Sequence, residues 1–196
     1  GSTLIHRFAA QVGFDKDFRC ILSDVGASID ILSLTDDKDL TALHVAAGNA
    51  DGGEKARAIL ELCDDPQTLL LNAPSAAGTG TPLRLAATMG HAKTCSVLLQ
   101  FARDRQEVLM AGDQTALIVV AGAGHLDVCR VLLQASPDRQ SLLEIPGSAY
   151  GATALHRAVQ GQSLDVLRVL CELARSQASL SHGIIPPSCV MGGSLV

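Results

Sequence analysis

Large aromatic side chains are scarce in this sequence. Tryptophan is absent, tyrosine occurs once, and aromatic residues make up 3% of the 196 residues. Hydrophobic residues nevertheless account for 47% of the chain, which excludes general disorder. Because aliphatic and alanine side chains must supply the core, we expect thin helices that pack closely together, in a chain long enough for one ordinary domain.

Three further absences argue against zinc-binding, membrane-bound and nucleic-acid-binding classes of protein. None of the six cysteines belongs to a C-x-x-C pair, so free buried thiols in a reducing compartment, cytoplasmic or nuclear, are expected rather than a zinc site. The sequence has no signal peptide and no run of about 18 apolar residues, so no membrane partner is expected. The net charge of −5 disfavours nucleic acid, which attracts basic surfaces.

A string that begins with threonine recurs along the chain. Its copies are TLIHRFA at 3–9, TALHVAA at 41–47, TPLRLAA at 81–87, TALIVVA at 115–121 and TALHRAV at 153–159. A second string follows, and its clearest copies are GHAKTCSVLL at 90–99 and GHLDVCRVLL at 124–133. Threonine suits a helix N-terminus, and the apolar residues of the second string have helical spacing. Each repeat therefore predicts two helices.

These strings resemble the ankyrin repeat, whose signature T-P-L-H-x-A-A-x-x-G-H precedes an I-V-x-L-L-L helix. The resemblance covers most of residues 3–177. It implies an all-α ankyrin-repeat solenoid of about five helix-turn-helix repeats with exposed hairpin or loop connections, because such units bury their apolar sides only by stacking. The domain is expected over residues 1–180, followed by a C-terminal tail at 181–196. Its repeats are expected to begin near Thr3, Thr41, Thr81, Thr115 and Thr153.

The linkers between repeats differ from the family pattern. In place of the usual G-A-D-V-N, the middle repeats are followed by DPQTLL at 65–70, DRQEVL at 104–109 and DRQSLL at 138–143, with a partial echo at 176–180. We refer to this as the D-x-Q-x-[LV]-L element. Its apolar pair is expected to lie buried beneath the hairpin that begins the next repeat.

Catalytic and metal-binding patterns are missing. His6, His44 and His156 fill the signature histidine position, where the resemblance implies local hydrogen bonds that fix the turn. No serine or cysteine has a histidine and a carboxylate at a spacing that suggests a triad, and there is no glycine-rich phosphate loop. We therefore expect no enzyme activity, cofactor or metal. Arg7 and Arg157 replace apolar residues of the inner repeats, so the first and fifth repeats are expected to be caps.

The resemblance implies a protein-interaction module, either an adaptor, a scaffold or an inhibitor, that binds through hairpin tips and the concave face of the first helices. Each candidate below could instead be an ordinary solvated residue, although Tyr150 is the only tyrosine and this residue type is favoured at binding hot spots. The tip candidates are Asp36, Asp37, Lys38, Asp39, Asp113, Gln114 and Tyr150, and the concave-face candidates are Asn49, Arg84, Thr88, Met89 and Gln160.

Charge is distributed unevenly and suggests the kind of partner. Residues 1–65 hold twelve acidic and six basic side chains, whereas residues 66–196 hold eight and nine. We expect a monomer whose partner protein contacts the acidic end with a basic segment. The alternative is a regulatory segment of a larger enzyme or channel whose catalytic part lies outside this chain, which begins Gly1-Ser2 rather than with Met.

Overall fold

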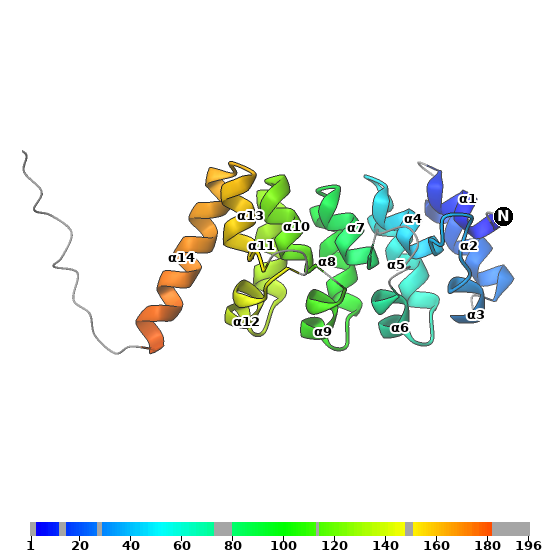
Figure 1. The fold of residues 1–196 in the computed structure, drawn as a ribbon. Coiled ribbons are helices and arrows are strands. Elements are labelled where there is room, and N and C mark those ends of the chain that lie inside the picture. The colour runs from blue at the N-terminus through cyan, green and yellow to red at the C-terminus, as the bar shows by residue number, and fades with distance from the viewer. Residues whose placement is uncertain are drawn as a thin grey trace, which may run out of the picture.

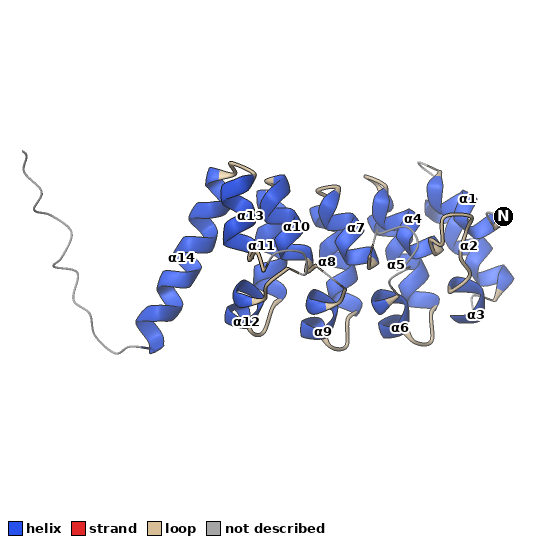
Figure 2. Ribbon diagram, viewed as in Figure 1, coloured by secondary structure: helices blue, strands red, loops and turns tan. Residues whose placement is uncertain are grey.

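The computed structural model describes residues 3–11, 15–26, 29–72, 80–112, 114–147 and 151–181. Within these ranges the regular secondary structure is entirely helical. The one β-contact found there is an isolated antiparallel bridge between Thr35 and Thr41. The helices stack in a single row from α1 to α14 (Figure 1; Figure 2). This arrangement confirms the all-α ankyrin solenoid.

The helices fall into three columns along the row (Figure 1). The first helices of the repeats are α1 (Leu4–Ala10), α4 (Ala42–Gly48), α7 (Pro82–Thr88), α10 (Ala116–Ala123) and α13 (Ala154–Gln160). The second helices are α2 (Asp15–Val25), α5 (Gly52–Leu62), α8 (Ala92–Phe101), α11 (Leu126–Ala135) and α14 (Leu164–Ser181). A third column of short helices consists of α3 (Ile29–Leu32), α6 (Pro66–Leu71), α9 (Arg105–Met110) and α12 (Arg139–Glu144).

The core runs along the row as a continuous aliphatic layer. Leucine at one position of the first helices, namely Leu43, Leu83 and Leu117, is fully buried. Small side chains at the next turn, such as Ala46 and Ala86, are also fully buried and allow neighbouring first helices to approach closely. Because each interface uses equivalent residues, every inner repeat is held by the repeats on both sides.

The third column is not predicted by the ankyrin signature. The D-x-Q-x-[LV]-L element forms a short helix whose aspartate caps its N-terminus: the carboxylates of Asp104 and Asp138 accept the backbone N–H groups of Glu107 (3.0 Å) and Ser141 (3.1 Å). The expected burial of the apolar pairs is confirmed, since Leu69, Leu70, Val108, Leu109, Leu142 and Leu143 are buried. These helices pack against the following repeat: α6 contacts α7 and α8, and α12 contacts α13 and α14.

The partial echo of this element at 176–180 does not form a separate helix. Helix α14 instead continues without a break to Ser181. No proline or glycine interrupts residues 164–181, and serine replaces the aspartate that precedes α6 and caps α9 and α12 with its side chain. The predicted tail from residue 182 onwards lies outside the described residues.

Candidate partner-binding surface

One position of the first helices forms a row of incompletely buried side chains, which we call the front strip. Its members are Arg7, Val45, Leu85, Val119 and Arg157. Arg7 is exposed and the other four are half-buried, although their helix neighbours Ala46, Ala86 and Val120 are fully buried. The strip therefore crosses all five repeats as an apolar centre with an arginine at each end.

Two glycines lie next to side chains of the front strip, at distances where a Cβ would make only ordinary van der Waals contact. A Cβ placed on Gly48 would lie 3.5 Å from Cδ2 of Leu85, and one on Gly122 would lie 3.5 Å from Nε of Arg157. The Nε of Arg157 is buried without a hydrogen-bond partner, while its Nη1 donates to Oε1 of Gln160 at 3.3 Å.

The concave-face candidates differ in the exposure of their side chains and in their hydrogen bonds within the fold. Thr88, Met89 and Gln160 are exposed, and Met89 has an exposed fraction of 53%. Asn49 is half-buried and its Nδ2 donates to the carbonyl oxygen of Ala9 at 2.9 Å, so it joins two repeats. Met89 and Gln160 therefore remain the stronger contact candidates, and Asn49 has a structural role.

The expectation that Arg84 is exposed is wrong. Its exposed fraction is 8%, and it fills the helix position that histidine takes in repeats one, two and five. Its side chain lies across Gly80, because a Cβ on that glycine would come within 2.2 Å of Nε of Arg84. Gly80 also has φ of +69°, a conformation that L side chains rarely adopt. Glycine therefore provides the space that buries the arginine.

The first hairpin tip is built around Asp36. Its Oδ1 accepts the N–H groups of Lys38 (2.8 Å) and Leu40 (3.0 Å), and Asp39 follows in a left-handed conformation with φ of 58°. Although partial burial alone would raise the pKa of Asp36, the two N–H donors leave it below its ordinary value. Asp36 thus shapes the turn, whereas Asp37, Lys38 and Asp39 are exposed.

The later hairpin tips are described only in part. Asp113 and Tyr150 lie outside the described residues, and the tips at 73–79 and 148–150 lie there too. Gln114 is described and is half-buried. The structure therefore brings together the front strip and the exposed end of α7, and a contribution from the later tips stays a prediction.

The signature histidines make the expected local contacts with the threonine that begins each repeat, and His6 and His44 also connect consecutive repeats. Nε2 of His6 lies 2.8 Å from the carbonyl oxygen of Leu40, and Nε2 of His44 lies 3.0 Å from that of Gly80. Because a carbonyl can only accept, Nε2 carries the proton in both rings. His156 occupies the same position at the last repeat and is exposed, with Nδ1 2.9 Å from Oγ1 of Thr153.

Burial makes His44 a neutral residue. Desolvation lowers the pKa of His44 to about 4 from its ordinary 6.5, despite the hydrogen bond to Gly80 and the negative charge of Asp36, which both favour the charged ring. The neutral ring accepts the Thr41 N–H at Nδ1 (3.3 Å) and donates from Nε2, so it bridges two repeats through both nitrogens.

The thiols are free in the part of the chain that the structure describes. Cys63, Cys95 and Cys129 are buried and Cys171 is half-buried, but Cys20 is exposed. The interpretation as buried thiols is therefore wrong for Cys20, which lies on the outer side of α2. Burial raises the pKa of the Cys95 thiol to about 12 and that of Cys129 to about 11.

Metal ligands and membrane-spanning helices do not appear among the described residues. Those ranges contain no group of three or more His, Cys, Asp or Glu side chains arranged to hold a metal ion. They also contain no helix that combines the length and the apolar character needed to cross a bilayer.

Comparison with protein families agrees with the geometry. A family model described as ankyrin repeats (3 copies) matches residues 57–141 and 105–180. These matches span more than half of the sequence, so the chain belongs to the ankyrin repeat family, whose general role is protein–protein interaction. The comparison with curated proteins gives no match.

The front strip was missed as a binding candidate by sequence reasoning. Its three middle members, Val45, Leu85 and Val119, are apolar, so the sequence alone suggests that they belong to the core. The arginines at the same repeat position, Arg7 and Arg157, are the one sign in the sequence that a charged side chain fits there. A position that accepts both valine and arginine within one chain is a signal of partial exposure.

Proposed function

We propose that this chain is a protein-interaction module that binds its partner along the front strip and the neighbouring exposed residues Met89 and Gln160. The observation that carries the proposal is the row of incompletely buried apolar side chains across the middle three repeats, held on a rigid scaffold. Apolar anchors that become buried supply most binding energy in such interfaces, and methionine adapts to varied partners.

Charge supports a partner with a basic segment. Asp37 and Asp39 are exposed at the first tip, and Asp51 and Glu54 are exposed on the next repeat. Charges at the rim of an interface mainly raise the association rate, while the apolar anchors slow dissociation. We propose that the basic segment contacts this end while an apolar segment follows the front strip.

The setting proposed is the cytoplasm or nucleus, with the chain acting as a monomeric adaptor, scaffold or inhibitor without catalysis of its own. Free thiols at five described cysteines support a reducing compartment. The alternative remains a regulatory ankyrin segment of a larger enzyme or channel. The same surface would then contact the catalytic part, so the sequence of the full-length gene distinguishes the two.

The test compares captured proteins between two variants. Arginine at Val45 and Val119 should be compatible with the fold, because Arg7 and Arg157 already occupy this position. Leu62 on the second helix α5, which is half-buried and lies outside the front strip, gives the control Leu62→Arg. Affinity capture with quantitative mass spectrometry should find a partner lost with Val45→Arg/Val119→Arg and retained with the control. If every captured protein is retained by both variants, the front strip is not the binding surface.

A further inference from the structure

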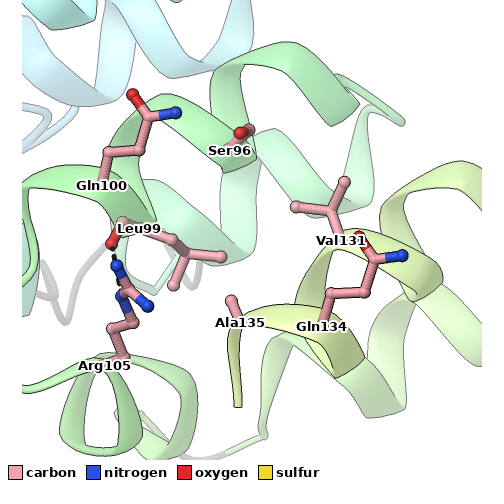
Figure 3. A pocket seen from close by; sticks show the side chains of 7 residues that line it. All are labelled: Ser96, Leu99, Gln100, Arg105, Val131, Gln134 and Ala135. Atoms are coloured by element: carbon pink, nitrogen blue, oxygen red, sulfur yellow. Dashed lines mark hydrogen bonds between the residues drawn. The ribbon is translucent and has the colours of Figure 1, made fainter.

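Two equivalent cavities lie on the side of the stack opposite the front strip, between consecutive second helices. The first lies among α8, α9 and α11, has a volume of about 220 Å³, and is lined by Leu99, Arg105, Val131 and Gln134 among others (Figure 3). The second lies one repeat further along, among α11, α12 and α14, with a volume of about 630 Å³. Gln134 lines both and joins them into one surface, which we call the back groove.

Each cavity has an arginine in the same place. Arg105 and Arg139 are the second residues of their D-R-Q elements, and Nε of each donates to a carbonyl oxygen in the last turn of the preceding helix, Leu99 at 3.2 Å and Leu133 at 2.8 Å. This bond fixes the guanidinium and leaves its terminal amino groups at the cavity (Figure 3). A planar guanidinium held in this way suits a carboxylate, which it binds through two parallel hydrogen bonds.

The corresponding place in the second repeat has different chemistry. Pro66 replaces the arginine there, and Glu61 replaces the glutamine that lines the later cavities. Glu61 already pairs with Arg19 at 2.6 Å. The cationic cavities therefore occur only among repeats three to five of the described part. Because the second repeat folds in the same way without the arginine, the ankyrin fold itself does not require these arginines.

The back groove has more basic than acidic side chains along its walls, and apolar side chains form its floor. The charged residues that line the two cavities and the adjoining hollow at 102–105 are Arg103, Arg105, Arg130 and Arg139 against Asp104 and Glu172. Of the two acids, Asp104 is engaged in capping α9 through the N–H of Glu107. Apolar side chains at equivalent positions, such as Val131 and Val169, form the floor.

We propose that the back groove binds an extended acidic segment of a partner protein, with carboxylates at every third residue and apolar side chains between them. Neighbouring repeats are roughly 10 Å apart, as packed helices are. A polyproline II segment rises about 3.1 Å per residue, so positions i and i+3 of one face meet consecutive arginines. This surface is distinct from the front strip and opposite in its charge preference, which gives the module two independent docking faces.

Fluorescence anisotropy with a labelled peptide of repeated Glu-Pro-Leu triplets tests the proposal on the full chain. Saturable binding is expected, with affinity falling about tenfold or more in Arg105→Gln/Arg139→Gln, as expected for the loss of charge-assisted hydrogen bonds. The control Arg57→Gln/Arg168→Gln removes the same charge outside the groove and should change affinity less than about threefold. Equal losses in both variants, or no saturable binding by the unaltered chain, would overturn the proposal.

A second pair of variants separates a loss of groove binding from a loss of folding. Gln134→Glu places a negative charge in both cavities while keeping the arginine–carbonyl bonds, so it should also abolish binding even if the double arginine variant folds poorly. Its control is Gln162→Glu in the turn between α13 and α14, where the side chain is exposed outside both surfaces, and this variant should bind normally. Equal binding by Gln134→Glu and the unaltered chain would show that the peptide does not occupy the groove.

The spacing of the carboxylates is tested with a second peptide. A peptide of the same composition built from Glu-Glu-Pro-Leu-Pro-Leu repeats has no two glutamates three residues apart. It should bind more weakly, because its carboxylates cannot meet two consecutive arginines from one face. Equal binding of this second peptide, or displacement by an oligonucleotide that shows the same arginine dependence, would contradict the assigned ligand.

Discussion

His44 links two repeats through a ring that must stay neutral. Its folded-state pKa of about 4 lies below the ordinary 6.5, so the unfolded chain binds a proton between these values while the folded chain does not. The contribution of this residue to stability is therefore complete above pH 6.5 and is lost as the pH falls towards 4. The shift corresponds to roughly 3 kcal/mol at its full extent.

Urea titrations followed by circular dichroism should detect this loss. The free energy of unfolding should fall more steeply between pH 7 and 4.5 in the unaltered protein than in His44→Gln, whose side chain does not titrate. Gln140→Ala, which removes no titratable group, should retain the pH dependence of the unaltered protein. A His44→Gln profile parallel to that of the unaltered protein would show that another group governs acid unfolding.

Cysteine reactivity should follow burial. Cys95 and Cys129 are fully buried with raised thiol pKa values, whereas Cys20 is exposed. Brief iodoacetamide treatment of the native protein at pH 8, followed by peptide mass spectrometry, should label Cys20 well before the two buried thiols. Unfolding in urea should remove the difference. Rapid labelling of Cys95 or Cys129 in the native state would contradict the assigned helix register.

At the scale of elements, the third helices connect the repeats through glutamine. Oε1 of Gln67 accepts the backbone N–H of Arg103 at 3.0 Å, and its Nε2 donates to Glu107 at 2.7 Å. Gln106 repeats this role by accepting from the Ser136 hydroxyl at 3.1 Å. The short helices therefore act as a second set of lateral links beside the histidines.

Glutamine substitutions should separate these links from local effects. Gln67→Ala and Gln106→Ala should each lower the free energy of unfolding by about 1 kcal/mol, the usual net value of a lost hydrogen bond. Gln140→Ala is the matched control, because Gln140 bonds to Glu144 within its own helix at 2.9 Å and its loss should cost much less. Equal destabilisation by all three in denaturant titrations would argue against an inter-repeat role.

At the scale of the whole molecule, the two ends of the stack differ from its interior. Val159 has an exposed fraction of 62%, whereas the residues at its position in the inner repeats, Ala47, Ala87 and Ala121, are fully buried by the next repeat. Arg7 is exposed, as a polar cap requires, but Val159 and the 70% exposed Leu164 leave the last repeat with an apolar outer side. A capping role for the fifth repeat stays a prediction.

Charged substitutions should distinguish the end from the interior. Ala121→Lys buries an unpaired charge between two repeats and should destabilise the fold by several kcal/mol. Val159→Lys at the equivalent terminal position should shift Tm by only a few degrees, because the side chain reaches water. Thermal unfolding measured by circular dichroism compares them. Equal losses of stability in both variants would contradict an open end of the stack at α13.

The sequence by itself determined the repeat register. A helix-capping threonine, a buried leucine and small residues recur at fixed positions, and each such choice is local, so Thr41, Leu43 and Ala46 predict their helix without knowledge of its neighbours. The signature position also identified His44 as structural. These features depend on residues within one helical turn of each other.

Only the tertiary structure decided which positions remain accessible. Arg84 is buried because Gly80 leaves room for its side chain, and Val45 is half-buried although its helix neighbour Ala46 is fully buried. The arginines of the back groove act together only because α9 and α12 lie one repeat apart in space. Such properties depend on contacts between residues 30 to 40 positions apart, whose distances follow from the stacking of repeats and are not encoded in any single repeat.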